Sequence, residues 1–117
     1  MKLQATLPTS LALGALVAFA GLAYPGGARA ADENAAKLLA RQSNCFKCHA
    51  VDKKKDGPSY KETAKKYKGK PDAEETLIKH VTTKPMIEVD GKKEEHKALK
   101  STDPAEVKNA VDWILSL

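Results

Sequence analysis

The chain is poor in aromatic residues. They make up 5% of its 117 residues, and a single one is Trp. A domain of this size is near the lower limit for a self-sufficient hydrophobic core, so few large side chains leave its interior thin. No internal repeat and no linker-like segment divides residues 32–117. The composition therefore predicts one small domain that gains from apolar mass beyond its own peptide, such as a covalently held group.

Long apolar runs are also missing, because none reaches the roughly 20 residues that a membrane-spanning helix prefers. The main run, residues 11–24, follows the positively charged Lys2 and precedes Ala-Arg-Ala at 28–30, the small-x-small pattern that signal peptidase cleaves. We predict a signal peptide over residues 1–30 and an exported domain over residues 31–117. An uncleaved membrane anchor is the alternative. After cleavage, no stable membrane insertion is expected.

Cysteine is scarce, and both cysteines lie in one motif. Cys45 and Cys48 are separated by two residues and followed directly by His49. This Cys-x-x-Cys-His pattern is the attachment signature of a c-type haem. The two thiols reach the vinyl groups on one edge of a porphyrin, and the adjoining imidazole binds the iron. The motif predicts one covalent haem c per chain, with thioethers at Cys45 and Cys48 and His49 as the proximal iron ligand.

Three other uses of paired cysteines agree less well with the sequence. A thioredoxin-type pair needs a strand before it, and no β-branched strand precedes Cys45. A zinc site completed by His80 and His96 would need a more compact ligand spacing. A simple disulfide gives the adjoining histidine no role. The histidine and the predicted export signal together favour haem attachment.

Helical periodicity covers most of the exported part. We expect helices that begin at the caps Asp32 and Asp103, and two more over residues 60–67 and 72–81. The helix after Asp103 is the clearest, because Pro104 occupies its first position. The expected fold is all-α, with three to four short helices around one covalently bound haem.

The motif and its flanking segments resemble a class I cytochrome c of the small bacterial periplasmic monohaem type. The resemblance covers nearly all of residues 32–117, including Gly-Pro-Ser-Tyr-Lys at 57–61 and Trp-Ile-Leu at 113–115. It implies the cytochrome c fold with crossed terminal helices, one exposed haem edge, and single-electron transfer with redox partner proteins in the periplasm. We expect a monomer and no enzyme activity, since no second cysteine pair is present for a second haem.

The sequence departs from this family at the second axial ligand. Those proteins usually place a Met between prolines shortly before the terminal helix. Met86 is the one methionine after residue 30; it lacks a following Pro and lies further from Trp113 than the family spacing. The position with the family spacing is occupied by His96 or Lys97.

A short β-hairpin near residues 86–95 decides between the two candidates, because an Asp-Gly pair favours a two-residue turn. Strand alternation then puts His96 on a face with two apolar residues and Met86 on a face of charged residues. Only one face can lie against a porphyrin. We therefore prefer His96 as the distal iron ligand, with Met86 as the alternative. His80 is expected to be a partly exposed surface residue.

Lysine is abundant, and nine lysines gather from the motif to just past the second expected helix: Lys47, Lys53, Lys54, Lys55, Lys61, Lys65, Lys66, Lys68 and Lys70. Loss of the leader lowers the formal net charge from +5 to +3, because Lys2 and Arg29 leave with it. We interpret the cluster as a surface that steers acidic redox partners; a basic face kept for solubility is the alternative. Nucleic acid is not expected as a partner of an exported chain with intermixed acidic residues.

Two side-chain ligands leave no open iron position, which favours an electron carrier. The other function class is haem-based binding of a small gas, for which the distal ligand must be displaced. Carbon monoxide difference spectra of the reduced protein separate the two, because a six-coordinate carrier should barely change.

Overall fold

The computed structural model describes residues 29–117. The predicted signal peptide falls almost entirely on residues 1–28, outside the described part. Four helices, one short 3₁₀ turn and a two-stranded antiparallel hairpin follow one another in the described part. In order they are α1 (Glu33–Gln42), η1 (Cys45–Lys47), α2 (Tyr60–Tyr67), α3 (Ala73–Thr82), β1 (Met86–Val89), β2 (Lys92–Glu95) and α4 (Pro104–Leu115). No helix within residues 29–117 combines the length and apolar character needed to cross a membrane.

Local sequence signals set the helix starts. The Asp32 side chain accepts a hydrogen bond from the backbone N–H of Ala35, and Asp103 does the same at the start of α4. At α2, Ser59 and Glu62 exchange the two hydrogen bonds of a capping box. These side chains satisfy N–H groups that have no partner inside the helix. The expected all-α architecture is confirmed.

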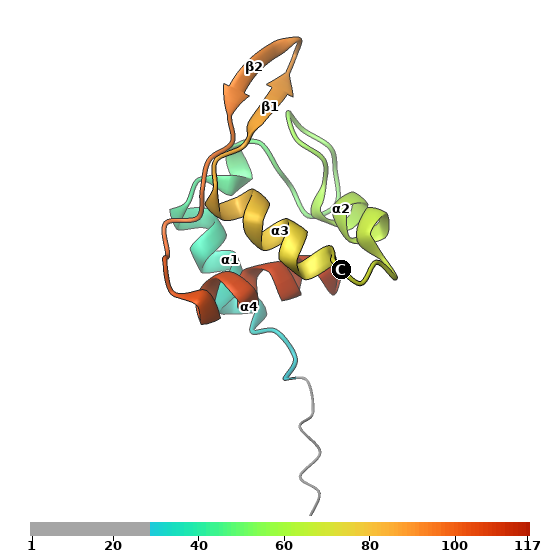
Figure 1. The fold of residues 1–117 in the computed structure, drawn as a ribbon, viewed down its shortest axis with the longest axis vertical. Helices are drawn as coiled ribbons and strands as arrows, with labels where there is room; N and C mark the ends of the chain where they lie inside the picture. Colours follow the sequence, from blue (N-terminus) through green and yellow to red (C-terminus); the bar gives the residue numbers. More distant parts are fainter. Residues whose placement is uncertain (1–28) are drawn as a thin grey trace, which may run out of the picture.

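Helix α4 is the element on which the other helices pack. Figure 1 shows α1 and α3 lying against α4, and α2 also contacts it. Its buried residues are Val107, Ala110, Val111 and Trp113. Trp113 is only 2% exposed and joins a core cluster with residues of α1 and α2. Because the cluster joins apolar side chains of α1, α2 and α4, it supports the segment that carries the motif.

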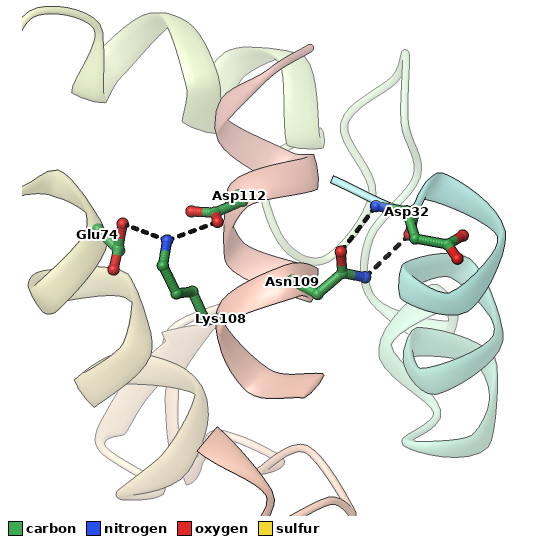
Figure 2. A network of polar contacts seen from close by, with 5 residues as sticks. All are labelled: Asp32, Glu74, Lys108, Asn109 and Asp112. Atoms are coloured by element: carbon green, nitrogen blue, oxygen red, sulfur yellow. Dashed lines mark hydrogen bonds and ion pairs between the residues drawn. The ribbon is translucent and has the colours of Figure 1, made fainter. Parts of the chain in front are cut away.

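Two polar contacts tie α4 to its neighbours (Figure 2). The Asn109 amide accepts from the backbone N–H of Asp32 at 2.7 Å and donates to the Asp32 carbonyl at 2.9 Å. The Lys108 ammonium lies 2.9 Å from a Glu74 carboxylate oxygen on α3 and 2.6 Å from one of Asp112. The first contact satisfies two backbone groups at the start of α1, whereas the second consists of exposed ion pairs.

Asn109→Ala should lower the free energy of unfolding by about 1 kcal/mol, because two hydrogen bonds to the start of α1 are lost. Lys108→Ala should have a smaller effect, since exposed ion pairs are screened by water and salt. Urea unfolding of both variants measures the difference. An Asn109→Ala variant as stable as Lys108→Ala would contradict this account of the α1–α4 contact.

The hairpin forms in the predicted register. Met86 pairs with Glu95 and Val89 with Lys92, and the turn residues between the strands have positive φ angles, as a two-residue turn of this type requires. Figure 1 shows the hairpin projecting on the side of the molecule opposite α4. The segment after β2 returns toward α3, where the backbone N–H of Leu99 donates to the Val81 carbonyl at 2.9 Å.

Candidate haem site

A cavity of about 620 Å³ opens between the motif, α2, α3 and the base of the hairpin. Its lining includes Cys45, Cys48 and His49 on one side and His96 with Ile87 on the other. The volume falls within the roughly 300–1,000 Å³ that is usual for cofactor sites. All four residues preferred as haem contacts from the sequence therefore face one space.

The motif adopts a tight turn at the cavity wall. The backbone N–H groups of Cys48 and His49 both donate to the Cys45 carbonyl, at 3.2 and 3.0 Å. Asn44, which precedes the turn, has φ of +60°, a conformation that Asn tolerates better than most residues. Both cysteines are half-buried, and the two sulfur atoms form no disulfide with each other. The turn brings two thiols and an imidazole to the same wall.

The His49 ring is fixed from several sides. Its Nδ1 atom lies 2.7 Å from the Pro58 carbonyl oxygen, so Nδ1–H donates and Nε2 stays free for a metal. Tyr60 stacks on the ring, with ring centres 5.3 Å apart and planes 22° apart. Gly57 packs so closely that a Cβ atom there would lie 2.5 Å from His49 Cε1. This arrangement is that of a held metal ligand.

His96 lies across the cavity at the end of β2. Its backbone N–H donates to the Pro85 carbonyl at 2.8 Å, which closes the base of the hairpin. Burial, with the neighbouring His80 and His49, lowers the pKa of His96 to about 4, so the ring stays in the neutral form that binds metals. Its Nδ1 atom is buried in protein, which leaves Nε2 for the cavity.

The spacing of the two imidazoles agrees with binding to a single iron. Their ring centres are 6.1 Å apart, and the planes are inclined at 56°. A metal lies about 2 Å from an imidazole nitrogen that binds it, and the ring centre about 1 Å further, so two rings on opposite sides of one ion have centres roughly 6 Å apart. The residues present therefore fit an iron held between His49 and His96.

Met86 lies on the other face of the hairpin. Its side chain is 61% exposed, and it is not among the residues that line the cavity. Ile87 and Val89, on the opposite face of β1, are half-buried and line the cavity. Burial along β1 therefore alternates as expected from the sequence, with Met86 at an exposed position outside the cavity lining.

The comparisons with known proteins agree with this geometry. The family description "Cytochrome c" matches residues 33–117. The chain belongs to the cytochrome c family. As expected from the motif, it carries one covalently bound haem c with its iron and is an electron-carrying haem protein. The relatives described below are named as cytochromes.

Two solved structures resemble this cytochrome over most of their length. Class 1 cytochrome MtoD from Sideroxydans lithotrophicus ES-1 is 59% identical, with a TM-score of 0.71 and coverage of 74% of this chain and 97% of that one. Cytochrome c552 from Nitrosomonas europaea is 30% identical, with a TM-score of 0.54 and coverage of 68% and 96%. The expected class I cytochrome c fold is confirmed.

Two further relatives match in sequence. Cytochrome c2 from Rubrivivax gelatinosus is 37% identical over 82 residues, which are 66% of this chain and 91% of that protein. Cytochrome c-552 from Hydrogenobacter thermophilus is 45% identical over 62 residues, 53% of this chain. The chain spans only 56% of that protein's length.

His80 of this cytochrome lies where the sequence interpretation did not place it. It is partly exposed, as expected, but it also lines the cavity, and its ring centre is 4.3 Å from that of His96. Leu77 and Val81 of α3 line the same space. The signal was present, because a residue three positions after a buried Leu shares its helix face. The expectation of a surface position rests on His80 lying one step away from the apolar stripe of Leu77, Ile78 and Val81.

The lysine cluster borders one side of the cavity. All nine lysines are exposed, and Lys47, Lys54 and Lys66 line the mouth itself. Lys61 is partly neutralised by an ion pair with Asp52. The lining also includes acidic residues, Glu88, Glu94 and Glu95 on the hairpin and Asp56 and Glu62 near the motif and α2. Lysines outnumber acidic residues in the segment from the motif to the end of the cluster.

Proposed function

We propose that this cytochrome is a periplasmic one-electron carrier whose iron is held by His49 and His96, with thioethers at Cys45 and Cys48. The observation that carries the proposal is the pair of imidazoles of His49 and His96 at the cavity, with ring centres 6.1 Å apart. The haem supplies reversible one-electron exchange when bound. The chain holds the two imidazoles in place, covers them with apolar side chains and leaves no position for a substrate.

Imidazole in place of a thioether has a consequence for the reduction potential. A Met ligand raises the potential of a c-type haem relative to a second His. With His49 and His96 as the two ligands, the protein is expected to be a low-potential carrier. Potentiometric titration of wild type beside the Met86→Ala variant checks this, since removing Met86 should leave the potential unchanged.

Docking of an acidic redox partner is proposed for the mouth lysines Lys47, Lys54 and Lys66. Electrostatic steering raises association rates by roughly 10- to 1,000-fold, and the effect is lost at high salt. The double variant Lys54→Glu/Lys66→Glu should slow electron transfer with an acidic redox protein by about tenfold at low salt. Lys68→Glu/Lys70→Glu, with the same charge change away from the mouth, is the matched control. Equal slowing in both would show that net charge alone matters.

Export and oligomeric state are part of the same proposal. We propose that residues 1–30 are removed as a signal peptide and that residues 31–117 form a monomeric haem domain in the periplasm. The mass and N-terminal sequence of the periplasmic protein test the cleavage site, which should expose Ala31. Sedimentation analysis tests the monomer.

Carbon monoxide distinguishes the carrier from a gas-binding protein. Because both axial positions are occupied by side chains, the spectrum of the reduced protein should barely change under the gas. Rapid and complete conversion to a carbon monoxide complex would instead show that the distal ligand is displaced easily.

A further inference from the structure

His96 has a buried ring nitrogen without a hydrogen-bond partner. Its Nδ1 atom and Nε1 of Trp113 are the two such side-chain atoms among residues 29–117. A neutral imidazole that binds iron through Nε2 carries its proton on Nδ1. Metal-binding histidines almost always donate that proton to a neighbouring acceptor. Ligation by His96 therefore requires an acceptor beside its ring.

His80 is the side chain whose ring packs against that of His96. The two ring centres are 4.3 Å apart with planes inclined at 55°, so the rings meet at an angle instead of stacking. A neutral imidazole has one nitrogen with a free lone pair, which makes it an acceptor.

A backbone carbonyl is the competing acceptor. Burial lowers the pKa of His96, and the nearby Lys97 backbone raises it by a smaller amount. However, no acceptor meets hydrogen-bond geometry at Nδ1. To accept from this atom the His80 side chain, which is half-buried at the cavity wall, has to rotate, and a side chain can do so whereas the carbonyl is fixed by the backbone.

We propose that His80 is a positioning residue that accepts the Nδ1 proton of His96 and sets the orientation and donor strength of the distal ligand. This rests on the proposed ligation by His96. A histidine whose Nδ1–H is donated is more basic at the metal-binding nitrogen. It stabilises oxidised iron relative to reduced iron, so His80 lowers the reduction potential of the protein.

Three variants of the haem-loaded protein test the proposal. His80→Phe keeps an aromatic ring but removes the acceptor, His80→Gln retains an acceptor oxygen, and Val81→Ala loosens packing on the same helix at the same cavity. In ¹⁵N NMR of the reduced protein, His80→Phe should speed hydrogen exchange of the His96 ring N–H by about five- to tenfold, the equivalent of one ordinary hydrogen bond. Its reduction potential should rise. His80→Gln should restore both values toward wild type, and Val81→Ala should leave the exchange rate unchanged.

The outcomes separate this inference from the proposed function. Suppose that the wild type shows two imidazole ligands and that His80→Phe changes neither the exchange rate nor the reduction potential. The role of His80 would then be overturned and the ligation left intact, with the Lys97 carbonyl as the acceptor of the proton. An equal effect of Val81→Ala would reduce the role to packing and also overturn it. A wild type with a sulfur ligand would overturn both proposals.

Discussion

Replacing His96 by Ala should convert the oxidised haem from low spin to high spin. On the proposed ligation, one of two strong-field imidazole ligands, whose ring centres lie 6.1 Å apart, is then lost. His80 is the one further histidine in the chain and lies beside the site, so His80→Phe/His96→Ala excludes its capture of the iron. Nearly complete conversion in the double variant is expected, measured by electron paramagnetic resonance and the Soret spectrum.

Met86→Ala is the control for this experiment. Because the Met86 side chain is 61% exposed on the far face of the hairpin, its loss should leave the spin state unchanged. The reverse pattern, with a low-spin His80→Phe/His96→Ala variant and a high-spin Met86→Ala variant, would show that the hairpin presents its other face to the haem. The preference for His96 would then be wrong.

Gly57→Ala is expected to have the second large effect. The new Cβ atom would lie 2.5 Å from His49 Cε1 and 2.8 Å from Nδ1, the nitrogen that faces Pro58. Something must shift, and overpacking of this kind costs about 1–3 kcal/mol. In a domain of this size each kcal/mol lowers the Tm by roughly 4–8 °C. Thermal unfolding, followed at the Soret band and by far-ultraviolet circular dichroism, measures the loss.

A matched control adds a side chain to the hairpin. Gly91 has φ of +75°, which Asn tolerates, and nothing lies within 4 Å of a Cβ atom there. Gly91→Asn should therefore lower the Tm by much less than Gly57→Ala. A Gly57→Ala protein with the Tm and Soret spectrum of wild type would show that the glycine does not hold the proximal ring.

The parts of the fold that local signals determine could be read from the sequence. The caps Asp32 and Asp103 act within one helical turn, so their effect does not depend on the rest of the chain. The Asp-Gly turn likewise fixes the hairpin register, because a two-residue turn allows one pairing of its flanking strands. The covalent attachment residues lie in one continuous motif, which is why the haem was predictable.

The contacts between distant segments could not be read in this way. The burial of Trp113 depends on how α4 crosses α1. Trp113 is more completely buried than Ile114, and both residues line the cavity. The contact of His80 with His96 joins α3 to the segment after β2, and the packing of Gly57 on His49 joins a loop to the motif. Such pairs follow from tertiary packing. The periodicity of one segment does not predict which distant segment will pack against it.

X-ray absorption at the iron edge of the oxidised wild-type protein tests the proposed ligation most directly. A metal lies about 2.0 Å from an imidazole nitrogen and about 2.3 Å from a sulfur ligand, so the two are resolved as separate shells. With His49 and His96 as ligands, the spectrum should fit nitrogen neighbours alone at about 2 Å. A sulfur neighbour at about 2.3 Å would contradict the account and assign the distal position to Met86.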